Sequence, residues 1–137
     1  MNLSLVDAFR AFGAKPNSRL KCASAMAADG AMVLNCSYAQ FGHPARGVLR
    51  YEDRLSREPA NPEESRRLSE HLTLARDGEL PIRMVVMSRV VENSPGPRSF
   101  HVRPDLTGKV VKFDGDHFIV DFTRPEEMEA VAVARRK

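Results

Sequence analysis

Apolar residues recur at helical spacing near the start of the chain. Leu5, Phe9 and Phe12 stand at i, i+4 and i+7, and the preceding Asn2 or Ser4 is a suitable N-cap. This pattern predicts a short amphipathic helix with one face in the core.

The spacing then changes to an alternation of period two on both sides of Asp29-Gly30. Residues 20–28 lead into this dipeptide and residues 31–38 lead away from it. Asp-Gly between two alternating runs predicts a β-hairpin, because glycine accepts the positive φ of a tight turn. One face of the second strand would carry Met32, Leu34, Cys36 and Tyr38, and the other Val33, Asn35 and Ser37.

The segment after this hairpin lacks such a clear pattern. Residues 40–47 are predicted to be a loop, and residues 47–51 a third, shorter strand. Residues 52–62 are charged and contain prolines, so an exposed connection is expected there.

The middle of the chain predicts a second helix followed by a buried strand. Asn61-Pro62-Glu63-Glu64 supplies an N-cap, a proline at the first helical position and acids near the positive end of the helix dipole. The helix is expected over residues 62–77. Residues 82–91 are dense in branched apolar side chains, which favours a central strand buried on both faces.

The last third of the chain predicts a second hairpin. Residues 99–103 suit a brief strand, and two alternating runs flank Asp114-Gly115-Asp116. Residues 124–137 begin with acids and end with basic residues, which favours a C-terminal helix, while a strand or a tail stays open.

These elements predict a single α+β domain over residues 1–137. The length suits one hydrophobic core that needs neither a metal nor disulfides for stability. We expect a mainly antiparallel sheet of about five to six strands, with two or three helices packed on it.

Cysteine usage and apolar segments bear on the compartment. Two cysteines, Cys22 and Cys36, are too few for a secreted disulfide framework or a four-ligand zinc site, so a cytoplasmic location is predicted. A three-residue loop over residues 28–30 would place the two opposite each other, and whether they pair stays open. We expect neither a secretion signal nor a membrane span.

Charge is uneven along the chain. The net charge is +3, yet residues 1–50 alone hold six Lys and Arg against two acids. Basic side chains neutralise phosphates, and exposed aromatic rings stack on bases. The alternative is that Phe41 and Tyr51, like Tyr38, are core residues and the arginines a solvated face. The predicted nucleic-acid-binding residues are Lys15, Arg19, Lys21, Tyr38, Arg46, Arg50 and Arg54.

Side chains able to carry catalysis form no recognised motif. Asp114, Asp116 and His117 offer two carboxylates and an imidazole that suit a divalent cation, with a polar hairpin tip as the alternative. A hydrolase or nuclease would draw on these three residues together with His101 and Asp105. We predict no catalytic residues and no cofactor.

The segment from Asp7 to Asn17, DAFRAFGAKPN, resembles a family of small bacterial and phage-encoded proteins that begin with a helix and an "FGAKPxN" turn. The resemblance extends loosely to about Phe122. It departs at Arg19–Ser24, where the family has a tryptophan-rich strand and this chain has no tryptophan. The resemblance carries over no functional residue, and it implies a role in nucleic-acid transactions or in phage–host or mobile-element conflict.

Three functional hypotheses follow. The first is a non-enzymatic protein that binds nucleic acid through the basic N-terminal half. The second is a protein-binding inhibitor or adaptor in a defence or counter-defence system, or a homodimeric module. The third is a metal-dependent hydrolase or nuclease.

Overall fold

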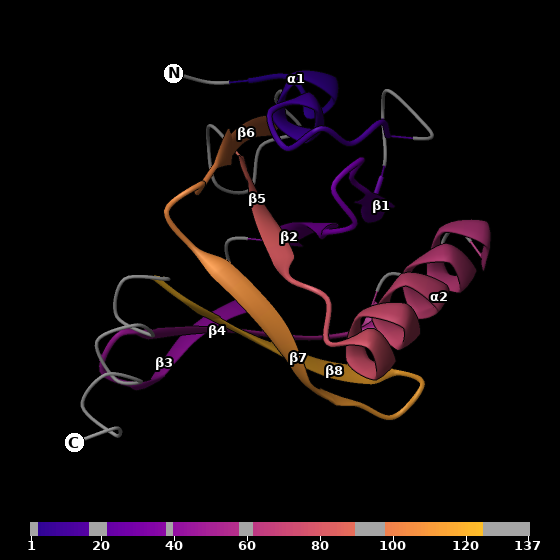
Figure 1. Cartoon of the computed structure of the whole chain (residues 1–137), viewed down its shortest axis with the longest axis vertical. Helices are drawn as coiled ribbons and strands as arrows, with labels where there is room; N and C mark the ends of the chain where they lie inside the picture. The colour runs from indigo at the N-terminus through magenta and orange to yellow at the C-terminus, as the bar shows by residue number, and fades with distance from the viewer. Residues whose placement is uncertain (1–2, 17–21, 38–39, 58–61, 90–97, 125–137) are drawn as a thin grey trace.

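The computed structural model describes residues 3–16, 22–37, 40–57, 62–89 and 98–124. These residues form one α+β fold in which two helices, α1 (Leu5–Arg10) and α2 (Pro62–Gly78), pack on a mostly antiparallel sheet (Figure 1). A short 3-10 helix, η2 (Leu55–Arg57), precedes α2. The predicted fold class is confirmed.

The described residues form an eight-stranded sheet, which corrects the prediction of about five to six strands. Its order is β1-β2-β5-β7-β8-β4-β3, and β6 pairs with β5 at the edge that also meets β7. The strands are β1 (Ser24–Met26), β2 (Met32–Ser37), β3 (Phe41–Ala45), β4 (Val48–Arg54), β5 (Ile82–Arg89), β6 (Arg98–Val102), β7 (Thr107–Phe113) and β8 (His117–Thr123).

Strand β3 occupies residues that the sequence predicts to be a loop, and that prediction is wrong. Phe41–Ala45 pairs antiparallel with β4, with a bulge between Gly42 and Ala45. Glycine and proline in this run hide the strand pattern, and an edge strand tolerates both. The prediction that an exposed connection begins at residue 52 is also wrong, because β4 continues to Arg54.

Both predicted helices form, although α1 ends at Arg10, so Phe12, predicted to lie on its apolar face, falls in the turn that follows. The Ser4 hydroxyl accepts a hydrogen bond from the Asp7 N–H at 3.1 Å and caps α1. Helix α2 begins at Pro62 and ends at Gly78, within one residue of the predicted span.

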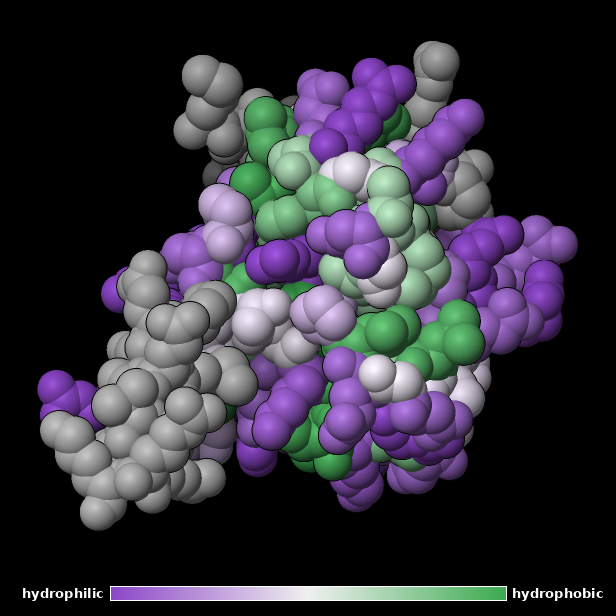
Figure 2. Space-filling model, viewed as in Figure 1, coloured by the Kyte–Doolittle hydropathy of each residue, from purple (hydrophilic) through white to green (hydrophobic). Residues whose placement is uncertain are grey.

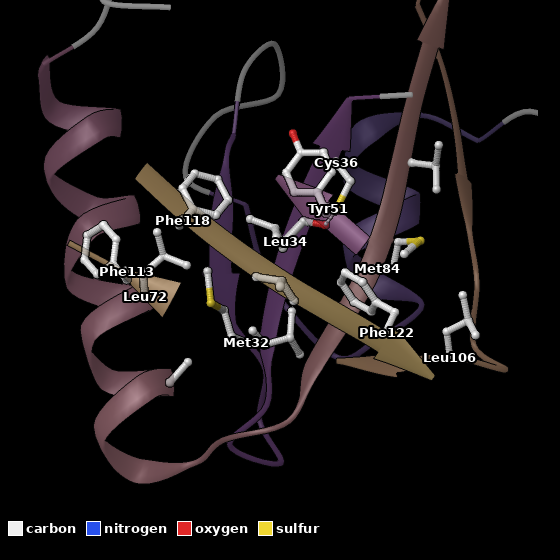
Figure 3. Close-up of a cluster of buried hydrophobic side chains, with 14 residues drawn as sticks. Met32, Leu34, Cys36, Tyr51, Leu72, Met84, Leu106, Phe113, Phe118 and Phe122 are labelled. Atoms are coloured by element: carbon white, nitrogen blue, oxygen red, sulfur yellow. Dashed lines mark hydrogen bonds between the residues drawn. The ribbon is translucent and has the colours of Figure 1, made fainter. Parts of the chain in front are cut away.

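Helix α2 covers one face of the sheet and encloses the larger core (Figure 3). Leu72 and Ala75 are its fully buried residues, and among the strands the helix contacts mainly β7 and β1. We call this cluster the α2 core. Its sheet members include Met32, Leu34, Cys36, Tyr51, Met84, Phe113, Phe118, Val120 and Phe122.

A second core lies on the opposite face of β2 and β5, under α1. Phe9 is fully buried there together with Val33 and Val85. We call this cluster the α1 core. Strands β2 and β5 therefore bury side chains on both faces, and they form the sheet's parallel pair, in which Met32 is the partner of Ile82.

The two hairpins predicted around Asp29-Gly30 and Asp114-Gly115-Asp116 are confirmed. Cys22 and Cys36 are both free thiols, and they are buried in different cores. Residues 125–137, for which a helix, a strand or a tail stays open, lie outside the described residues. No helix in the described part of the chain is long and apolar enough to cross a bilayer.

Candidate nucleic-acid interface

The four strands β7, β8, β4 and β3 present a polar surface on the side away from the α2 core. Phe118, Val120 and Phe122 of β8 point into that core, so the alternate residues point outward. Residues paired across an antiparallel ladder share a face. The register therefore defines what we call the outer face.

Three rows of paired residues cross this face. Lys109, Asp121 and Arg50 form the first row across β7, β8 and β4. The second row is Lys112, Ile119 and Glu52, and the third is His117 and Arg54. Arg46 stands at the rim, in the turn between β3 and β4.

Arg50 is held by the carboxylate beside it in the first row. Its Nε and Nη2 donate to the two oxygens of Asp121 at 2.7 and 2.9 Å. This two-point hydrogen bond raises the pKa of Arg50 above its ordinary value, and burial opposes the rise. The guanidinium plane is therefore fixed against β8 before any ligand arrives.

The other end of the outer face is ordered by a second set of polar contacts. His117 Nε2 lies 2.5 Å from Glu52 Oε2. Arg54 lies 3.6 Å from the Asp116 carboxylate, which also accepts hydrogen bonds from the N–H and hydroxyl of Ser56. Asp116 thus ties the β7–β8 turn to the end of β4.

Asp114 has a structural role in that turn. Its Oδ1 accepts hydrogen bonds from the N–H groups of Asp116 and His117 at 3.0 and 2.8 Å. These bonds hold the pKa of Asp114 below its ordinary value. The geometry of Asp114, Asp116 and His117 is therefore that of a hydrogen-bonded hairpin tip.

The candidates for metal-dependent chemistry do not converge. His101 is exposed on β6, and Asp105 is held by two hydrogen bonds from Arg103 at 3.0 and 2.9 Å, which lower the pKa of Asp105. Among the described residues, no group of three or more His, Cys, Asp and Glu side chains is placed to hold a metal ion.

Three basic residues of this surface are exposed. They are Lys109 and Lys112 on β7 and Arg46 in the β3–β4 turn. Within the described part of the chain, none of the three forms a salt bridge, although the charge of Lys112 acts on the Asp114 carboxylate. All three charges remain exposed to a ligand.

The residues predicted to bind nucleic acid are only partly brought together. Arg46, Arg50 and Arg54 lie on or beside the outer face, whereas Lys15 follows α1 at the other end of the molecule (Figure 1). Arg19, Lys21 and Tyr38 lie outside the described residues.

The aromatic residues near these arginines belong mainly to the core. Tyr51 is 2% exposed and packs in the α2 core (Figure 3). The Phe41 ring lies 5.2 Å from the Tyr51 ring and is partly buried. Tyr51 is therefore not a surface on which a base stacks.

The sequence prediction missed Lys109, Lys112 and Asp121. Alternation in the second hairpin could have placed Lys109 and Asp121 on one face. Their proximity to Arg50 depends on the pairing of β4 with β8, which joins segments about 70 residues apart and has no local signal.

An open groove of about 460 Å³ lies at the β3 side of the outer face. Its polar lining residues include His43, Arg50 and Glu52. The remaining lining residues are Gln40, Phe41, Gly42 and Pro44. Both strands of the β3–β4 hairpin thus contribute to one concave site.

Hydrophobic surface is divided into small areas on the side drawn in Figure 2. Deep green areas lie near α1 at the top and beside α2, with pale residues between them and hydrophilic residues around them. The large exposed hydrophobic residues of the described chain are Leu74, 54% exposed, and Val111, 43% exposed. Isolated exposed apolar residues of this kind are ordinary on folded proteins.

In comparisons with known proteins, the chain matches no family model, no curated protein and no solved structure, so its function is inferred from the geometry above.

Proposed function

We propose that this protein binds nucleic acid through the outer face, without catalysing a reaction. The observation that carries the proposal is the gathering of basic side chains from separate segments onto one side of the sheet, beside a groove. They are Arg46, Arg50, Arg54, Lys109 and Lys112. A link to phage–host or mobile-element conflict is part of the proposal and has its basis in the FGAKPxN resemblance.

The basic residues of the outer face differ in whether a neighbouring acid neutralises their charge. Arg50 and Arg54 are paired with Asp121 and Asp116, so much of their charge is already balanced. Exposed cations that form no pair are better placed to replace the counterions of phosphates. We therefore assign phosphate contacts to Arg46, Lys109 and Lys112, and orienting contacts to Arg50.

Salt dependence of binding tests the proposal. Labelled single- and double-stranded DNA and RNA oligomers are titrated with protein, and anisotropy is recorded from 50 to 200 mM salt. With three to four phosphate contacts, affinity should fall roughly 20- to 50-fold for single strands and roughly 40- to 150-fold for duplex DNA over this range. A fall of less than about twofold contradicts the proposal, because phosphate binding releases counterions.

A pair of charge-reversal variants locates the interface. Arg46→Glu/Lys112→Glu should abolish binding, because it places two acids on the proposed surface. Arg10→Glu/Lys15→Glu changes the net charge equally, but on α1 and just after it, and it should retain most of the affinity. If both variants lose binding equally, the attraction is general and the outer face is not the interface.

A second candidate function, binding of a protein partner or self-association, is favoured by the position of β3. This strand ends the sheet in the described strand order, and an edge strand offers unpaired backbone groups to another strand. Sedimentation velocity over a concentration series would detect self-association. The variant Ala45→Lys, at an exposed position of β3, should weaken it, and unchanged association would contradict a role for this edge.

A further inference from the structure

The groove beside β3 contains two functional groups whose orientations are set in advance. Arg50 and Glu52 are two residues apart on β4, so both side chains project to the outer face and both line the groove. Asp121 holds Arg50, and His117 contacts Glu52. A ligand entering the groove therefore meets a donor and an acceptor that do not need to be ordered.

Each of these groups keeps unused hydrogen-bonding capacity. Arg50 donates to Asp121 through Nε and Nη2. Among the described residues, Nη1 of Arg50 forms no hydrogen bond. His117 contacts Oε2 of Glu52, and Oε1 has no partner in the same part of the chain. The groove thus offers a guanidinium donor beside a carboxylate acceptor.

The pattern of donors and acceptors matches the edge of one base better than the others. Guanine carries two adjacent N–H donors, at N1 and N2, that suit a carboxylate, and an O6 acceptor that suits a guanidinium. Adenine has an acceptor at N1, which would face the carboxylate unfavourably. Cytosine and uracil each present a single N–H group at this edge.

The rest of the lining suits a flat ring. His43 and Pro44 are exposed at the groove, and Phe41, also in the lining, is partly buried with its ring 5.2 Å from that of Tyr51. Unstacked bases pack on histidine and other flat side chains in proteins that read single strands. The groove volume of about 460 Å³ lies within the range of small-ligand sites.

From this arrangement we infer that the groove receives one unstacked guanine of a single-stranded nucleic acid, read by Arg50 and Glu52 and stacked on His43. This inference rests on the proposed function and adds the class of ligand. It also requires a single strand, because the Watson–Crick edge of a base is occupied within a duplex.

The test compares uridine oligomers that carry one central guanosine, inosine or adenosine, with anisotropy as the readout at 50 mM salt. The guanosine oligomer should bind roughly 5- to 100-fold more tightly than the adenosine oligomer, in line with one well-formed pair of base contacts. Inosine lacks the N2 amine and should fall between the two.

Two variants identify the residues that read the base. Glu52→Gln should reduce the guanosine preference to less than about twofold, because the amide replaces one carboxylate oxygen by an NH2 group, which cannot accept from the N–H groups of guanine. The matched control Glu70→Gln removes an exposed carboxylate on α2 and should retain the preference. His43→Ala should weaken binding of every oligomer, because stacking is lost for all bases.

The outcomes separate this inference from the proposed function. If the wild-type protein binds guanosine and adenosine oligomers equally well and with strong salt dependence, the guanine site is overturned while the proposed function stands. A guanosine preference that survives Glu52→Gln also overturns it. If no oligomer binds at 50 mM salt, both are overturned.

Discussion

The hydroxyl of Tyr51 lies 2.9 Å from Oδ2 of Asp53, two residues further along β4, and both side chains are buried. The same hydroxyl accepts a hydrogen bond from the Ser37 N–H at 3.0 Å. Burial, together with the nearby Cys36 and Asp53, raises the pKa of Tyr51 well above its ordinary value. The phenol therefore stays protonated and donates to Asp53. One side chain thus connects the end of β2 to a buried carboxylate on β4.

Removing this hydroxyl should destabilise the protein. Tyr51→Phe removes the hydrogen bond that the hydroxyl donates to the buried Asp53 carboxylate and the one that it accepts from the Ser37 N–H, and the expected cost is about 1–3 kcal/mol in the free energy of unfolding. Urea denaturation measures the change. In an Asp53→Asn background the cost should be smaller, and an equal cost in both backgrounds would contradict the coupling.

Gly108 should not tolerate a side chain. A Cβ at this position of β7 would lie 2.7 Å from Cδ1 and Cε1 of Phe122, inside the α2 core. Gly108→Ala is therefore expected to cost roughly 1–3 kcal/mol, measured as a fall in the urea midpoint. Gly42→Ala is the matched control, because a Cβ there meets no atom within 4 Å, and an equal loss at both positions would contradict the steric reason.

Stability should depend on pH through His71. Its Nδ1 lies 2.7 Å from the hydroxyl of the buried Ser24, and burial, followed by Arg67, lowers the pKa of His71. The unfolded chain then takes up a proton before the folded protein does. This contribution to stability is complete above the unfolded pKa of about 6.5 and is lost as pH falls towards the lower folded pKa.

The pH dependence is measured by urea denaturation of the wild-type protein and His71→Gln from about pH 7.5 to 5. The other histidines are common to both proteins, so the difference between the two curves isolates His71. The wild-type curve should fall more steeply below about pH 6.5. Parallel curves would mean that the pKa of His71 is the same in the folded and unfolded states.

Both cysteines should resist modification in the folded protein. Cys22 and Cys36 are 2% and 0% exposed, and burial, followed by the charge of Asp53, raises the pKa of Cys36. A thiol reagent at about pH 8 should label neither cysteine before unfolding and both in denaturant. Rapid labelling of one thiol in the native protein would show that its core opens locally.

Local signals predicted most of the elements correctly. Pro62 and Gly78 bound α2, Ser4 caps α1, and apolar density identified β5 as buried on both faces. These features depend on neighbours within one helical turn or one strand. Edge strand β3 has no comparable local signal, because its extended conformation depends on pairing with β4.

The candidate site was predictable only in part, because it depends on strand order. The basic residues around the β3–β4 hairpin could be identified from the first half of the sequence, and three of them lie on or beside the outer face. The pairing of Arg50 with Asp121, and the presence of Lys109 and Lys112 beside them, follow from the contact between β4 and β8. No periodicity within either segment specifies that contact.

The strand order also constrains how the chain folds. The β1–β2 and β3–β4 hairpins are neighbours in sequence but end the sheet on opposite sides, with β5, β7 and β8 between them. Each hairpin can close locally, whereas joining them requires pairings between distant segments, such as Met32 with Ile82 and Leu49 with Phe122. During synthesis we therefore expect the first half of the chain to form two hairpins whose inner edges stay unpaired until β5 and β8 have emerged, and strand exchange between nascent chains to compete with folding in that interval.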